Sequence, residues 1–171
     1  FTISLGEAAA MEADAAKALI DQGVDILTQH TDSTGPMQVA EERGIKAFGQ
    51  ASDMIAAGPK SQLTAIVDTW GPYYIKRAQA LLDGKWETTS SWDGLKDGIL
   101  EMAAYTNMPD DVKAMAMDTE AKIKSGELHP FTGPITKQDG TEWLKAGEKA
   151  DDGTLLGLNF YVKGVDDKLP Q

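Results

Sequence analysis

The chain has 171 residues, of which 42% are hydrophobic and 25% are charged, and these values are typical of a globular protein with a buried core. Its 27 Asp and Glu residues outnumber its 16 Lys and Arg residues, which gives a net charge of −11 at pH 7. This balance argues against a nucleic-acid partner, because phosphate binding requires a basic face. The absence of cysteine excludes disulfides, thiolate metal sites and a cysteine nucleophile.

The first half of the chain alternates between strand and helix patterns. Residues 1–5 alternate weakly and predict a short strand, and residues 7–22 predict a helix that ends at Gly23. We expect Thr34 to be the N-cap of a second helix that ends at Gly44. Further strands are predicted at residues 24–28, 45–49 and 62–67. This succession, with short connections, is typical of an α/β fold with a parallel sheet covered by helices.

The second half of the chain is less regular. Residues 71–82 predict a helix with an apolar stripe, and residues 86–92 are polar and turn-like. A short strand is predicted at residues 98–100, and a clean helix at residues 109–124. The remainder predicts an irregular segment at 129–135, a hairpin turn at 138–141 and a helical turn at 152–158.

Polar or aromatic side chains follow three of the predicted strands. Thr31, Asp32 and Ser33 follow the strand at 24–28. Asp53 follows the next strand, and Trp70 follows the one after that. In open α/β sheets the carboxyl ends of the strands form the edge at which ligands bind. These five residues therefore predict a site for a small molecule.

Each of these positions also has a purely structural interpretation. The loop 31–33 precedes a helix N-terminus, whose N–H groups can bind a polar ligand atom or be capped by Thr34. Asp53 can accept hydrogen bonds from ligand hydroxyl or ring N–H groups, or it can form an Asx turn. Trp70 can stack on a flat heteroaromatic ligand, or it can belong to the core.

The sequence contains no motif for catalysis. His30, Asp32 and Ser33 have the residue types of a hydrolase triad, but neighbours on one loop cannot align a nucleophile, a base and an orienting acid. A Gly-x-Ser-x-Gly elbow, a Walker-type phosphate loop and a Gly-x-Gly-x-x-Gly fingerprint are all absent. Only His30 and His129 could supply imidazole, and without cysteine a transition-metal site would also need carboxylates, which show no ligand spacing. We therefore expect binding rather than catalysis, without catalytic residues, metal or cofactor.

Several stretches, taken in order, carry a resemblance to a known family that covers residues 12–170. They are Ala15–Ile26, Gln29–Ser33, Ala47–Gly49, Ser52–Met54, Trp70–Tyr74, Asp93–Gly98 and His129–Ile135. In these stretches the chain resembles the basic membrane protein (BMP) family of ABC-transporter solute-binding lipoproteins, of the purine- and purine-nucleoside-binding type.

The resemblance implies the type I periplasmic-binding-protein fold, in which two doubly wound α/β lobes with parallel sheets are joined by a hinge. A full member is much longer, so the chain resembles its C-terminal half. Residues 1–67 would form most of the second lobe, and residues 68–100 the hinge crossing and a helix of the first lobe. Residues 101–171 would form the C-terminal helices and a tail that wraps the lobes and the hinge. The rest of the first lobe would lie in a missing N-terminal half.

The resemblance also implies a function. It predicts a periplasmic or otherwise extracytoplasmic protein, attached to the membrane only through a lipid anchor outside this chain. Its hinge would close around a purine base, with adenine favoured, or a purine nucleoside, and deliver it to an ABC permease. Asp53 and Trp70 would bind the ligand, with the loop 31–33 at the rim. The family's usual stacking aromatic is missing from residues 6–11, so either Trp70 provides the ring contact from this half or the purine site is damaged.

The same fold also serves a different class of protein. A ligand-sensing core of a receptor or of a transcriptional regulator is the alternative interpretation, because one fold can host unrelated functions.

Overall fold

The computed structural model describes residues 5–169, which divide into two compact units at the boundary between Asp118 and Thr119. The first unit contains α1 (Leu5–Asp21), β1 (Ile26–Leu27), α2 (Gly35–Arg43), β2 (Lys46–Gly49), β3 (Gln62–Asp68), α3 (Trp70–Leu82), a 3-10 turn η1 (Leu95–Asp97) and β4 (Leu100–Met102). Helix α4 (Asp110–Ser125) spans the boundary. The second unit then contains β5 (Ile135–Thr136), β6 (Glu142–Leu144) and α5 (Asp152–Leu156).

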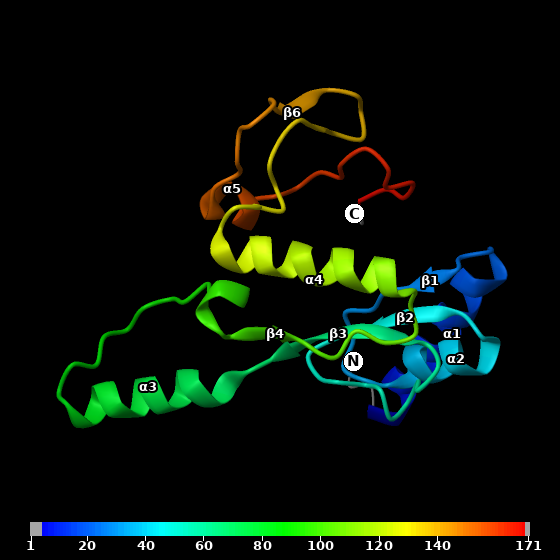
Figure 1. The fold of residues 1–171 in the computed structure, drawn as a ribbon, viewed down its shortest axis with the longest axis horizontal. Helices are drawn as coiled ribbons and strands as arrows, with labels where there is room; N and C mark the ends of the chain where they lie inside the picture. The colour runs from blue at the N-terminus through cyan, green and yellow to red at the C-terminus, as the bar shows by residue number, and fades with distance from the viewer. Residues whose placement is uncertain (1–4, 170–171) are drawn as a thin grey trace. The chain divides into compact units, whose positions relative to one another are not determined.

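The sheet of the first unit has the strand order β1-β2-β3-β4 (Figure 1). Strands β1, β2 and β3 run parallel, and β4 pairs antiparallel with β3. The predicted α/β fold with a parallel sheet is therefore confirmed, with one antiparallel strand added at its edge. Residues 50–61, which connect β2 to β3, form turns rather than a helix. This connection is long enough for a parallel crossover, which needs about a dozen residues.

Two of the predicted strands shift. The segment predicted at 24–28 forms only the two residues of β1, and the one predicted at 98–100 begins at Leu100. The second shift has a local cause, because Gly98 adopts a left-handed conformation (φ 74°) that ends the 3-10 turn η1. The strand predicted for residues 1–5 falls on residues outside the described part of the chain, except for Leu5, which begins α1.

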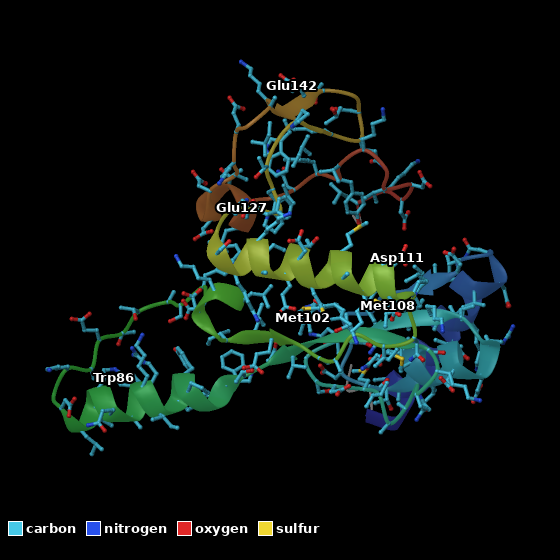
Figure 2. All side chains as sticks on the ribbon, in the orientation of Figure 1. Trp86, Met102, Met108, Asp111, Glu127 and Glu142 are labelled. Carbon is cyan, nitrogen blue, oxygen red and sulfur yellow. The ribbon has the colours of Figure 1, made fainter. Side chains whose placement is uncertain are left out.

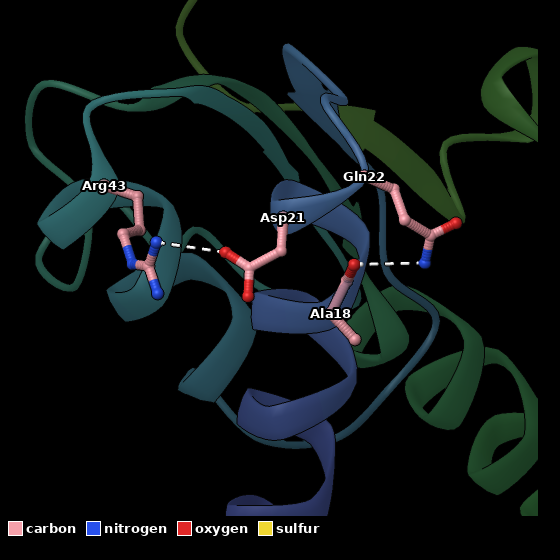
Figure 3. A network of polar contacts seen from close by, with 4 residues as sticks. All are labelled: Ala18, Asp21, Gln22 and Arg43. Atoms are coloured by element: carbon pink, nitrogen blue, oxygen red, sulfur yellow. Dashed lines mark hydrogen bonds and ion pairs between the residues drawn. The ribbon is translucent and has the colours of Figure 1, made fainter.

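The core of the first unit lies where α1 and α2 cover β1 and β2 (Figure 1). Its buried residues are Ala16, Leu27, Met37, Val39, Ala40, Ala47 and Met54. Arg43 Nη1 lies 3.2 Å from Asp21 Oδ1 and so connects the last turns of the two helices on the exposed side of this core (Figure 3). Gly44 (φ 70°) ends α2 as predicted, in the left-handed conformation that favours glycine.

Helix α3 forms where it is predicted but buries none of its residues. Its apolar stripe is exposed: the relative accessibility of Ile75 is 71% and that of Leu82 is 81%. The polar segment that follows returns to the helix at Trp86, whose ring centroid lies 4.1 Å from the Arg77 guanidinium carbon (Figure 2). The periodicity of α3 is therefore amphipathic, although no part of the first unit covers its apolar face.

The second unit contains the predicted hairpin, formed by β5 and β6. Asp139 Oδ1 accepts hydrogen bonds from the amide and hydroxyl groups of Thr141 in the turn. These bonds stabilise the charged carboxylate and lower the pKa of Asp139. The ring of Trp143 packs edge-to-face against Phe131 and Phe160, so an aromatic cluster joins the hairpin to the segments on both sides of it.

Met37 belongs to the core of the first unit and is fully buried, with a relative accessibility of 0%. We expect Met37→Ala to lower the free energy of unfolding by about 2–5 kcal/mol, since the cavity removes packing contacts that the neighbours cannot recover. Met117→Ala is the matched control, because Met117 is 52% exposed and its loss should change stability by less than about 0.5 kcal/mol. Urea unfolding of both variants measures the difference, and equal effects would contradict this description of the core.

Candidate functional site

The loops that follow β1, β2 and β3 leave the sheet at the same edge, because the three strands run parallel. Two hydrogen bonds join these segments. Gln29 Nε2, after β1, donates to Met54 Sδ, after β2, across 2.9 Å. The Asp68 amide at the end of β3 donates to the Ala51 carbonyl across 3.0 Å. The predicted residues therefore lie on one edge of the sheet, on connected loops.

The side chain that binds the N-terminus of α2 comes from Ser33 and not from the N-cap residue, Thr34. The Ser33 hydroxyl accepts a hydrogen bond from the Gly35 amide (3.1 Å), whereas the Thr34 side chain makes no cap bond. The Ser33 hydroxyl also donates to the Glu12 carboxylate, which accepts the Ser33 amide as well (3.3 Å). Thr34 is therefore the N-cap residue by position, as predicted, but its side chain makes no cap bond. A carboxylate from α1 already occupies the position beside the N-terminus of α2 where an anionic ligand would bind.

Two polar atoms in the loop after β1 are buried without a hydrogen-bond partner among the described residues. They are Gln29 Oε1 and Thr31 Oγ1. Both residues line a cleft of about 350 Å³, whose apolar wall includes Ala15 and Leu27. Asp32 is exposed beside them. Buried polar atoms normally have partners, so these two are available to a ligand group that can donate or accept a hydrogen bond.

Asp53 is an exposed residue held by two hydrogen bonds to one of its oxygens. Oδ1 accepts the Gln62 side-chain amide (2.7 Å) and the Ile55 backbone amide (3.1 Å). The second bond, from residue i+2, is the Asx turn that was the structural alternative for this position. The Asx turn and a ligand-binding role are compatible, because neither described bond uses Oδ2.

Trp70 begins α3 and packs on the aromatic residues of its own first turns. Its ring stacks on Tyr74 (5.8 Å between centroids, 21° between planes) and meets Tyr73 edge-on. Trp70 is 48% exposed and lines a second cleft, of about 360 Å³, together with Asp68, Tyr73, Trp92 and Asp93. This cleft shares no lining residue with the cleft at Thr31, so Trp70 and Thr31 line different clefts, and Asp32, Ser33 and Asp53 line neither of them.

The arrangement supplies hydrogen-bond acceptors and hydroxyl groups. No group of three metal-ligating side chains occurs among residues 5–169. Besides Asp139, Asp151 also has a lowered pKa, because it accepts hydrogen bonds from Thr154. Both lie in the second unit, far along the chain from this edge. No helix in the described part of the chain is long and apolar enough to cross a membrane.

Sequence reasoning missed two residues whose side chains bind the loops of this edge, Glu12 and Gln62. Gln62 is 1% exposed at the start of β3. A polar residue that opens an otherwise apolar strand pattern was the available signal, because a buried amide needs hydrogen-bond partners. Glu12 left no such signal, since its partner Ser33 is 21 residues away in the chain.

Residues 7–130 match a protein family described as ABC transporter substrate-binding protein PnrA-like (Bmp). The chain belongs to the Bmp family. It is 74% identical over 160 residues to a purine-binding protein of Brucella abortus, an alignment that covers 94% of this chain and 46% of that protein. This member of the Bmp family therefore spans about half the length of that relative.

Solved structures resemble the chain at low sequence identity. A structure described as a transcriptional activator of the comK gene from Bacillus halodurans matches 71% of this chain and 44% of its own, with a TM-score of 0.63 and 20% identity. An ABC transporter solute-binding protein from Aeropyrum pernix matches 75% of this chain and 44% of its own, with a TM-score of 0.55 and 15% identity. Identities this low establish the fold alone. They agree with the predicted type I periplasmic-binding-protein fold.

The cap on α2 gives a direct test of the Ser33 geometry. Ser33→Ala removes the hydroxyl that both caps Gly35 and binds Glu12, so we expect a loss of about 1 kcal/mol in the free energy of unfolding. Thr34→Ala should cost less than about half of that, because its hydroxyl makes no cap bond. Urea denaturation compares the two variants, and a larger effect at Thr34 would mean that the Thr34 hydroxyl is the capping group after all.

Proposed function

We propose that this chain is the C-terminal half of an exported solute-binding protein that delivers a purine base, with adenine favoured, or a purine nucleoside to an ABC permease. The observation that carries the proposal is the 74% identity to a protein named for purine binding, over 94% of this chain. The Bmp family is named for substrate binding in ABC transport, not for catalysis, which supports a binding role.

The chemistry of the sheet edge supports a neutral ligand that donates hydrogen bonds. The loop after β1, residues 50–59 of the loop after β2 and the first turn of α3 contain no Lys or Arg, and Lys60 lies at the other end of the β2–β3 connection, directly before β3. They do contain Asp32 and Asp53, and Asp68 ends β3 beside them. We assign Asp53 to ring N–H or ribose hydroxyl groups and Trp70 to the ring face, with the loop 31–33 at the rim. A phosphate would meet like charge at Asp32, Asp53 and Asp68.

We propose that residues 1–67 form most of the second lobe, and that residues 68–100 cross the hinge and supply a helix of the first. The uncovered apolar face of α3 supports this assignment, because a contiguous exposed apolar surface is typical of an interface. Residues 101–171 would then form the C-terminal helices and the tail that wraps the lobes and the hinge. In this arrangement hinge closure around the ligand would signal occupancy to the permease.

The proposal places the protein outside the cytoplasm, with a lipid anchor, where present, outside this chain. A missing N-terminal half would supply the rest of the first lobe. The alternative, a ligand-sensing core, has only the shared fold in its favour.

Isothermal titration calorimetry on a two-lobe protein that contains this chain tests the ligand. We expect adenine or adenosine to bind with a Kd of about 1 µM or tighter, and AMP to bind at least about tenfold more weakly than adenosine, because its phosphate carries nearly two negative charges. Glucose and an amino acid serve as controls without a planar heteroaromatic ring. Binding of a control alone would overturn the purine proposal, and equal binding of AMP would contradict the charge argument.

Asp53 is the residue on which we expect adenine affinity to depend most. Asp53→Ala should weaken adenine binding at least tenfold, on the order of 1.4 kcal/mol, because it removes the carboxylate that accepts the ligand's N–H groups. Asp25→Ala is the matched control, since Asp25 is an exposed carboxylate before β1, at the opposite edge of the sheet. Calorimetry on both variants decides the point, and unchanged affinity in Asp53→Ala would remove Asp53 from the site.

A further inference from the structure

We infer that Gln62 is a positioning residue, which fixes the Asp53 carboxylate so that one of its oxygens remains available to the ligand. The inference rests on the proposed function, because it assigns Asp53 to ligand binding. It extends that proposal to a residue on another element, inside the sheet. Gln62 itself would touch no ligand, because it acts through Asp53.

The side chain of Gln62 forms a two-sided bridge to the loop after β2. Its Nε2 donates to Asp53 Oδ1 (2.7 Å), and its Oε1 accepts the Met54 backbone amide (2.9 Å). Two consecutive residues are therefore held by the two ends of one amide group. A carboxamide is the side chain that can do this, because it offers a donor and an acceptor side by side.

Gln62 is itself firmly anchored. It is 1% exposed, and its backbone carbonyl accepts hydrogen bonds from Thr106 Oγ1 (2.7 Å) and Asn107 Nδ2 (2.7 Å). Gly49 makes room for its side chain, because a Cβ at Gly49 would lie 3.0 Å from Gln62 Oε1. The Gln62 side-chain amide is thus held in place by the sheet, and its hydrogen bonds in turn hold Asp53 and Met54 in the exposed loop.

The bridge decides which Asp53 oxygen is available. Both described hydrogen bonds, from Gln62 and from Ile55, use Oδ1. An exposed aspartate would otherwise lose side-chain freedom when a ligand binds, at a cost in affinity. Preorganising the carboxylate removes that cost, so Gln62 should contribute to affinity without contacting the ligand.

Amide hydrogen exchange tests the positioning without any ligand. Carbonyl-13C Asp with 15N-Met, and carbonyl-13C Met with 15N-Ile, isolate the Met54 and Ile55 amides, because each dipeptide occurs once in this chain. Gln62→Glu keeps an acceptor for the Met54 amide but loses the donor to Asp53. We expect the Ile55 amide to exchange at least about tenfold faster in this variant while Met54 keeps its protection.

Two further variants keep this test decisive if Gln62→Glu folds poorly. In Gln62→Met both bridging bonds are lost, so both amides should exchange faster. Thr106→Val is the matched control, because it removes a hydrogen bond to the Gln62 backbone but leaves the side-chain bridge intact, and both amides should remain protected. An Ile55 amide that stays protected in Gln62→Glu and Gln62→Met would overturn the inference, since Asp53 would then keep its position without Gln62.

A double-mutant cycle with adenine, on a two-lobe protein that contains this chain, tests the functional half. We expect Gln62→Glu to weaken adenine binding about tenfold, and the double variant with Asp53→Ala to bind no more weakly than Asp53→Ala alone. Additive losses would show that Gln62 acts independently of Asp53 and would overturn the inference. If Asp53→Ala alone leaves adenine affinity unchanged, the assignment of Asp53 fails, while the exchange data still decide whether Gln62 positions it.

Discussion

The close approach of β2 and β3 is the constraint on which the candidate site depends. Gly49 pairs with Ala65 across these strands, and a Cβ at Gly49 would lie only 2.7 Å from the Ala65 Cβ. The space left by glycine lets the Gln62 side chain lie beneath the loop that follows β2. A larger residue at position 49 would push both the strand and this amide away, so a backbone requirement inside the sheet controls the position of Asp53 at its edge.

The sequence predicted the elements better than it predicted their polar contacts. Helices such as α3 were found because their apolar periodicity is local, and α2 was bounded correctly by Gly44. Thr34 is the N-cap of α2 as its position predicts, but the hydroxyl that binds the helix N-terminus is that of Ser33, which also binds Glu12 from another helix. The hydrogen bond between Gln62 and Asp53 could not be predicted either, because it forms only in the folded parallel sheet. Contacts of this kind depend on tertiary structure, and no local pattern encodes them.

The exposed apolar face of α3 and the length of the Brucella relative support the same proposal, an interface between lobes. A helix with an apolar stripe normally gains its stability by burying that stripe. Here the stripe of α3 finds no cover within the first unit, and this chain corresponds to 46% of the Brucella protein. Relatives of that length contain enough additional chain to cover it. The uncovered apolar face therefore supports the proposed assignment of α3 to an interface between lobes.

The polar atoms at the sheet edge limit the kind of ligand it can hold. The Ser33 hydroxyl is already used by Gly35 and Glu12, and Asp53 Oδ1 by Gln62 and Ile55. What remains is mainly acceptor capacity, on Gln29 Oε1 and Asp53 Oδ2, with the Thr31 hydroxyl able to act either way. A ligand without N–H or O–H groups would leave the buried Gln29 Oε1 unpaired, at a cost of about 1–3 kcal/mol. The proposed purine ligand fits this requirement, because a purine base presents such donors on a flat ring, whereas a phosphate would need basic residues.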